Sequence, residues 1–175
     1  LPPDGDWRIW LILAGRGFHP HRETPMHARH AALGAKWMQA GMWLRPEYYA
    51  APGRSKDDCV REEVHAVRTG VGLIDVGTLG KMELFGPDAA LFLERVYTGR
   101  FASLKVGATR YGVMLDETGV VIDDGVIARL ADDHFYFTTT TTGAATVYRE
   151  LQRLNAEWNL DIGIVNVTGA FAAVN

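Results

Sequence analysis

The chain has a single cysteine, Cys59, among its 175 residues. With one cysteine it can form neither an intrachain disulfide nor a cysteine-based zinc site. Thiol usage this sparse fits a reducing compartment, so we expect a cytoplasmic protein. The longest apolar run near the N-terminus, residues 9–14, is much shorter than the roughly 20 residues that a membrane-spanning helix requires.

An excess of charge of one sign is also missing. The formal net charge is −3, from 18 basic and 21 acidic side chains. Because the signs are interspersed, charge gives no reason to expect binding to nucleic acid or to a membrane surface. The glycines at 70 and 72 do not form a dinucleotide fingerprint, since they follow a predicted helix and the third glycine is replaced by Asp75. The histidines at 19, 21, 27 and 30 lack further ligands at convergent positions, so we expect no metal site.

Apolar spacing predicts the elements. It favours helices over residues 27–37 and 57–69, the second with Ser55 or Asp57 as its start signal. A third helix is opened by residues 86–88, and its predicted apolar face is Ala89, Phe92, Leu93 and Val96. A fourth helix has an apolar face that ends at Trp158, and its predicted cap is Thr141 or Thr142. Residues 43–52 read as a packed loop. Strands are predicted at 71–76, 81–85, 109–115, 119–130, 134–140 and 161–168. This mixed order predicts an α+β fold, with a mainly antiparallel sheet flanked by helices.

Two adjacent acids lie near the middle of the strand at 119–130. Because side chains alternate along a strand, Asp123 and Asp124 point to opposite faces. Asp124 shares its face with apolar residues only, and a carboxylate there is costly to bury unless something uses it. We take Asp124 as the first candidate for chemistry. The alternative is that it accepts hydrogen bonds from a nearby loop.

Hydroxyl groups surround this strand in the predicted arrangement. Tyr111 lies on the strand expected to pair with the Asp124 strand, so its phenol either neighbours the carboxylate or packs in the core. Residues 138–142 are five consecutive threonines at a strand end before a helix. Their hydroxyls are suited to capping the helix or to binding a ligand.

Several segments, in order, resemble the folate-binding aminomethyltransferase family, of which the glycine-cleavage T-protein is a member. They are residues 62–68, 71–76, 79–81, 86–89, 110–114 and 119–126. Within the family, residues 24–27, 33–37, 75–81, 97–100 and the threonine run are more similar to the C-terminal region of the sarcosine oxidase α subunit. The chain departs from the T-protein pattern at Gly77-Thr78, where a serine and a histidine are usual, and in the segment at 40–43.

The resemblance implies the N-terminal half of the family's fold and a role for each candidate residue. Asp124 would lie beside the pteridine-side nitrogens of tetrahydrofolate, position the folate and assist proton movement, which makes it the expected catalytic residue. Leu79, Tyr111, Val126 and Thr139 match positions that line the same pocket. Asp123 is left as scaffolding, with Arg129 as its expected partner.

The resemblance also implies an activity. It indicates the folate-binding portion of a sarcosine oxidase α subunit, in which a flavin on another subunit oxidises sarcosine and tetrahydrofolate captures the one-carbon unit as 5,10-methylenetetrahydrofolate. FAD, FMN and NAD are expected elsewhere in the complex. The expected partners are a flavin-bearing β subunit and the smaller subunits of a heterotetramer. The alternatives are a flavin-independent aminomethyltransferase or demethylase, and a non-catalytic folate-binding scaffold.

The expected organisation has four segments: an irregular lead-in or linker at 1–26, the start of the first folate-binding subdomain at 27–58, an α+β subdomain with the Asp124 strand at 59–160, and a return strand at 161–175. The chain starts without methionine and stops within an apolar run. We therefore expect a fragment that is inactive and binds folate weakly by itself, because further folate ligands in the family come from beyond residue 175.

Overall fold

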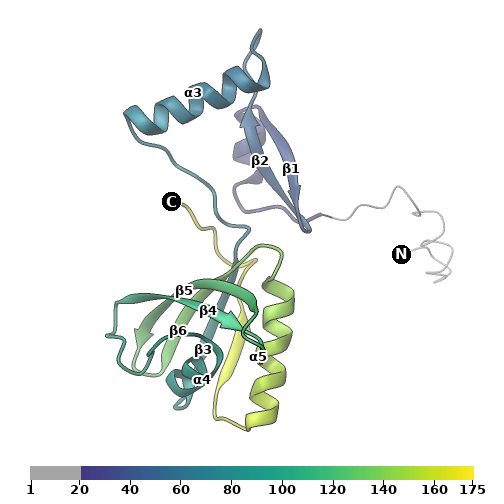
Figure 1. Cartoon of the computed structure of the whole chain (residues 1–175). Coiled ribbons are helices and arrows are strands. Elements are labelled where there is room, and N and C mark those ends of the chain that lie inside the picture. The colour runs from purple at the N-terminus through teal and green to yellow at the C-terminus, as the bar shows by residue number, and fades with distance from the viewer. Residues whose placement is uncertain (1–20) are drawn as a thin grey trace, which may run out of the picture.

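The computed structural model describes residues 21–175, and these form two parts (Figure 1). The upper part in the figure contains a hairpin and two helices: α2 (His27–Ala32), β1 (Ala35–Ala40), β2 (Trp43–Tyr49) and α3 (Lys56–Thr69). The lower part is a five-stranded sheet with two helices. The segment 70–79 joins the parts, and the C-terminal residues run back beside it, with Asp75 bridged to Val174.

The large sheet has the strand order β4-β5-β6-β3-β7, and every neighbouring pair is antiparallel. Its strands are β3 (Gly80–Phe85), β4 (Thr109–Leu115), β5 (Val121–Ala131), β6 (His134–Thr139) and β7 (Gly163–Asn166). The helices of this part are α4 (Ala89–Val96) and α5 (Ala144–Trp158). The predicted α+β class with a mainly antiparallel sheet is confirmed.

One face of this sheet packs against α4 and α5, and we call it the covered face. The predicted apolar face of α4, which is Ala89, Phe92, Leu93 and Val96, is buried there. The sheet contributes Met82, Leu84, Met114, Ile127, Phe135 and Phe137 to the same core. On the opposite face, which we call the open face, side chains such as Tyr111, Asp124 and Val126 are exposed or half-buried. Removal of apolar surface from water on the covered face therefore holds the sheet and helices together.

Three predictions about the segment before β3 are wrong. Helix α2 ends at Ala32, because Gly34 adopts a left-handed φ of 82° and the chain turns into β1. The loop predicted at 43–52 contains strand β2, which tolerates Pro46 because it is an edge strand beside a register shift in β1. Residues 71–76 do not form a strand and contribute only the bridge at Asp75.

The caps of the two long helices differ from each other. Of the two predicted start signals of α3, Ser55 is the cap, since its hydroxyl accepts a hydrogen bond from the Asp58 amide at 3.2 Å. Helix α5 begins after Gly143, and the hydroxyl that accepts from the Gly143 amide, at 3.2 Å, belongs to Thr140. The prediction of Thr141 or Thr142 as its cap is therefore wrong. The lead-in at 1–26 lies mostly outside the described residues.

Candidate functional site

Asp124 and Tyr111 meet on the open face of the sheet. The Tyr111 hydroxyl donates a hydrogen bond to the Asp124 carboxylate. The antiparallel register explains the contact, because β4 and β5 pair Tyr111 with Val126 and Val113 with Asp124. Tyr111 is 58% exposed and Val126 is 42% exposed. The structure thus brings three of the predicted site residues together on a surface that a ligand can reach.

The electrostatics of this pair keep the phenol protonated. The hydrogen bond to Asp124 raises the pKa of Tyr111 above its usual value, and burial and the negative charges of Asp124 and Asp123 add to the effect. Tyr111 therefore remains a donor at neutral pH. A carboxylate offers about four acceptor positions on two oxygens, so Asp124 retains acceptor capacity for a ligand.

Asp123 has the opposite environment, on the covered face. It is 3% exposed, and its carboxylate accepts from the amide of Asp124 at 2.7 Å and from the amide and hydroxyl of Thr140 at 2.9 and 2.8 Å. The expected pairing with Arg129 is wrong. That guanidinium donates to the backbone carbonyls of residues 102, 104, 131 and 132 instead. Asp123 therefore fixes the backbone at the start of α5 against the strand that carries Asp124.

Thr139 is separated from the other predicted site residues. It is 2% exposed, pairs with Gly80 and donates its hydroxyl to the Thr140 carbonyl at 3.2 Å. Its neighbour Thr138 lies on the open face, where its hydroxyl accepts from the Val126 amide at 3.1 Å. Sequence reasoning missed Thr138, although alternation gave the signal. Phe135 and Phe137 are core residues, so Thr139 shares their face and Thr138 does not.

Leu79 lies in the turn that leads into β3, half-buried. Strand β6 separates β3 from β5, so the turn lies roughly 10 Å from the Asp124 strand at a spacing of about 4.8 Å per strand. That separation is comparable to the length of a two-ring heterocycle. Leu79 is thus placed to bound one end of a site whose other end is Tyr111 and Asp124.

A second polar pair, His134 and Glu83, lies on the part of the open face formed by β3 and β6, away from Asp124. His134 Nε2 lies 3.2 Å from a Glu83 carboxylate oxygen. Burial and the charge of Glu83 raise the pKa of Tyr136, which lies opposite Glu83 on β6.

Among residues 21–175, no group of three His, Cys, Asp or Glu side chains gathers as metal ligands would. Within the same residues, no helix has both the length and the apolar character needed to cross a membrane.

Comparison of the sequence with known proteins shows the family of the chain. The family model of the GCVT N-terminal domain matches residues 26–175. The chain therefore belongs to this family. A solved structure of glycine cleavage system aminomethyltransferase T from Bartonella henselae has the same fold, with a TM-score of 0.71 at 23% identity. The match covers 84% of this chain and 38% of that one.

Curated relatives of two kinds match the chain. The sarcosine oxidase subunit alpha of Corynebacterium sp. (strain U-96) is 48% identical over 171 residues, which are 94% of this chain and 18% of the relative. The corresponding subunit of Rhizobium meliloti is 40% identical. An aminomethyltransferase of Thermotoga petrophila is 31% identical over 87% of this chain and 39% of the relative. The chain thus spans only a minor part of the curated relatives it matches.

Proposed function

We propose that this chain is the folate-binding portion of a sarcosine oxidase α subunit, from the C-terminal region of that subunit. One observation carries the proposal: the Tyr111 phenol and the Asp124 carboxylate are hydrogen-bonded on an open face, beside the exposed apolar side chain of Val126. The 48% identity to sarcosine oxidase subunits, against 31% to an aminomethyltransferase, favours this assignment. Tetrahydrofolate is the one-carbon acceptor in this proposal.

The residues present fit a reduced pterin. Such a ring is flat, apolar on its faces and edged by N–H donors, so it needs apolar walls and an acceptor at one edge. Val126 and Leu79 supply apolar surface, and Asp124 supplies the acceptor. Tyr111 and Thr138 add hydroxyls on the same face. Thr139 lies on the covered face, so its contribution to a folate site would be indirect, through the backbone of β6.

The chain's own residues would act as follows. Asp124 accepts a hydrogen bond from the ligand edge and holds or moves one proton at its carboxylate, as a general acid or base does. Tyr111 fixes the orientation of that carboxylate by donating to one of its oxygens. Bound tetrahydrofolate supplies the nucleophilic nitrogens that capture the one-carbon unit as 5,10-methylenetetrahydrofolate.

The oxidation of sarcosine is assigned to the rest of the complex. In this proposal a flavin-bearing β subunit oxidises the substrate, and FAD, FMN and NAD are bound outside these residues. Smaller subunits complete a heterotetramer, and the assembly is cytoplasmic. The four-segment organisation, with the Asp124 strand in the subdomain at 59–160, is part of the same proposal.

The test uses the complete protein, expressed from its own gene and purified with its partners. Sarcosine is supplied with and without tetrahydrofolate, and free formaldehyde and 5,10-methylenetetrahydrofolate are quantified. We expect tetrahydrofolate to divert the one-carbon unit from formaldehyde to the folate product. Substituting Asn for Asp124 should restore formaldehyde release, whereas the exposed control Glu117→Gln should not. Formaldehyde release that is insensitive to tetrahydrofolate in the unsubstituted protein would refute the proposal.

A flavin-independent aminomethyltransferase is the second candidate, because the aminomethyltransferase relative matches 87% of this chain. It predicts a colourless protein that transfers an aminomethyl carbon to tetrahydrofolate without oxidation. Absorbance of the purified complex between 350 and 500 nm, roughly the range of flavin bands, separates the two candidates.

A further inference from the structure

Two buried side chains of opposite charge lie where the two parts join: Asp75 in the joining segment and Lys81 in β3. The Asp75 carboxylate accepts from the Gly77 amide at 2.7 Å. The Lys81 ammonium donates to the Gly77 carbonyl at 2.6 Å and to the Leu79 carbonyl at 3.2 Å. These side chains therefore hold residues 77–79, which we call the clamped turn, from both ends.

Burying the charges of Asp75 and Lys81 costs desolvation free energy, which their hydrogen bonds must offset. Lys81 is 0% exposed and Asp75 is 8% exposed. Burial lowers the pKa of Lys81, and the charge of Asp75 opposes part of that effect. Burial also opposes ionisation of Asp75, but its hydrogen bonds outweigh burial and its pKa lies below the usual value. An apolar side chain at position 81 would fill the space without this desolvation, so the ammonium is best explained by the carbonyls it binds.

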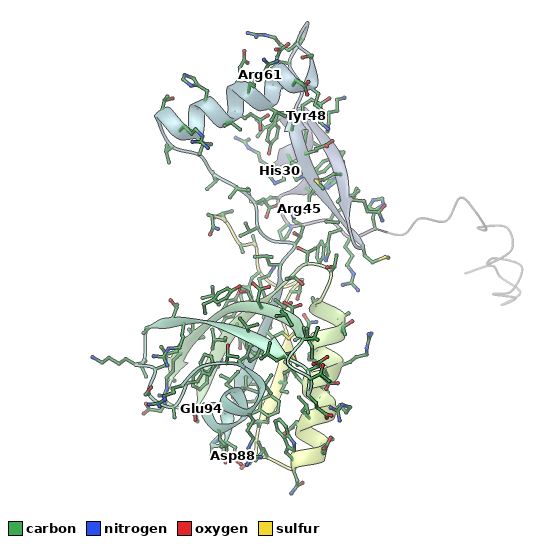
Figure 2. The ribbon with its side chains drawn as sticks, in the orientation of Figure 1. His30, Arg45, Tyr48, Arg61, Asp88 and Glu94 are labelled. Atoms are coloured by element: carbon green, nitrogen blue, oxygen red, sulfur yellow. The ribbon has the colours of Figure 1, made fainter. Side chains whose placement is uncertain are left out.

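The same carboxylate ties the clamped turn to the upper part of the molecule. Asp75 accepts from the Thr24 hydroxyl at 2.7 Å and lies 3.0 Å from His30 Nε2. His30 Nδ1 lies 2.7 Å from the Tyr49 hydroxyl. In Figure 2 the labelled His30 is in the upper part, beside the hairpin. The turn is therefore fixed to β2 and α2 on one side and to β3 on the other.

The clamped turn also contacts the sheet next to the candidate site. The Thr78 and Thr141 hydroxyls lie 3.1 Å apart, which links the turn to the residues that follow β6. A side chain at position 77 would place its Cβ 2.8 Å from an Asp75 carboxylate oxygen, so the carboxylate can lie this close to the turn only if it shifts or if residue 77 is glycine. Leu79 ends this turn, and its amide donates to the Val76 carbonyl at 3.0 Å.

We propose that Lys81 is a positioning residue: by binding the Gly77 and Leu79 carbonyls it sets the place of Leu79 at the end of the ligand site. It does not touch the reacting atoms. The identity of the ligand in this inference rests on the proposed function. The effect of the Lys81 ammonium on the backbone of residues 77–79 does not depend on that function. The positioning effect should therefore appear in the binding of tetrahydrofolate and not in the chemical step.

The first measurement is amide hydrogen exchange in the complete protein. Lys81→Met retains an unbranched side chain and removes the ammonium, and Lys105→Met is the matched control at an exposed lysine. We expect exchange at the Gly77 and Leu79 amides to rise at least about tenfold in Lys81→Met, because charged hydrogen bonds of this kind are lost. Amides of β5 should be unchanged. Equal exchange in both variants would overturn the proposal.

The second measurement separates positioning from general stability. The Kd and KM for tetrahydrofolate should rise about tenfold in Lys81→Met, while kcat at saturating folate stays within about twofold. Faster exchange with unchanged folate affinity would overturn the link between the turn and the ligand. If Lys81→Met fails to fold, Lys81→Gln, which retains an N–H donor, is measured in the same way, with smaller expected changes of the same sign.

The two proposals fail in different ways. An unsubstituted protein that binds no tetrahydrofolate contradicts the proposed function. The exchange experiment then still decides whether Lys81 holds the clamped turn, because it needs no ligand.

Discussion

The two faces of the five-stranded sheet are built from the same strands and have opposite properties. On the covered face, Phe135 and Phe137 are 0% exposed and pack against α4 and α5. On the open face, Tyr111 of β4 and Val126 of β5 remain accessible to solvent. The strand β5 places one acid on each: Asp123 among backbone donors and Asp124 beside a phenol.

The comparison shows that residue type alone does not separate a structural acid from a functional one. Both carboxylates accept hydrogen bonds, but Asp123 is buried and accepts three, from the Asp124 amide and from the amide and hydroxyl of Thr140, which leaves little capacity for a ligand. Asp124 has a side-chain partner on an accessible surface. Alternation along one strand is sufficient to place one acid among buried donors on the covered face and the other on an accessible face.

The largest difference between the faces should appear in stability. Phe137→Ala on the covered face should lower the free energy of unfolding by about 4 kcal/mol, because it leaves a cavity in a packed core. Val126→Ala on the open face should cost less than about 1 kcal/mol, since that side chain is already largely solvated. Urea unfolding followed by circular dichroism measures both. Similar losses in the two variants would mean that the faces are not distinct.

Most of the sheet could be predicted from the sequence because its signals are local. Strand β4 has the predicted bounds, Thr109–Leu115, and the apolar face of α4 is buried as predicted. The predicted strand at 71–76 pairs only at its C-terminal end, where Ile74 and Val76 form backbone hydrogen bonds with Asn175 and Ala173 around the bridge at Asp75. Val71 is 91% exposed and Leu73 is 72% exposed. An apolar alternation indicates a potential strand, whereas strand formation also needs an edge to pair with.

The candidate site was predictable only in part, for a similar reason. Asp124 and Tyr111 lie on consecutive strands of a hairpin, so alternation and register place them together. The contacts of Asp75 join it to Thr24 and His30, which are far away in the sequence, and no local pattern encodes such pairs. Thr139 was assigned through family likeness and not through alternation, which gives Thr138 to the open face.

The next largest effect concerns the open-face acid. Asp124→Ala should lower formation of the folate product about 100-fold, which is about 2.7 kcal/mol, because a general acid or base typically contributes at least that factor. The free energy of unfolding should change little. Product formation at saturating sarcosine and folate is the measurement, with Glu117→Ala as the exposed control. A loss that is matched by unfolding would remove Asp124 from the chemistry.

Substitution of Asp123, the acid on the covered face, should lower stability more than product formation. Asp123→Ala leaves the Asp124 and Thr140 amides without their acceptor in a buried place, which should cost about 2 kcal/mol of unfolding free energy. Product formation per folded molecule should fall far less than in Asp124→Ala. Both quantities are measured on the same preparations. Equal losses of product in the two variants would contradict the assignment of the faces.

The smallest effect tests the phenol beside Asp124. Tyr111→Phe removes one hydrogen bond at an accessible position, so the KM for tetrahydrofolate should rise about threefold with unchanged unfolding. Because the pKa of Tyr111 lies above its usual value of about 10, the phenol remains a donor up to about one pH unit below that value. The ratio of the two KM values should therefore be constant from pH 7 to about pH 9. A ratio that falls toward one within this range would show that the phenol ionises early and does not orient Asp124.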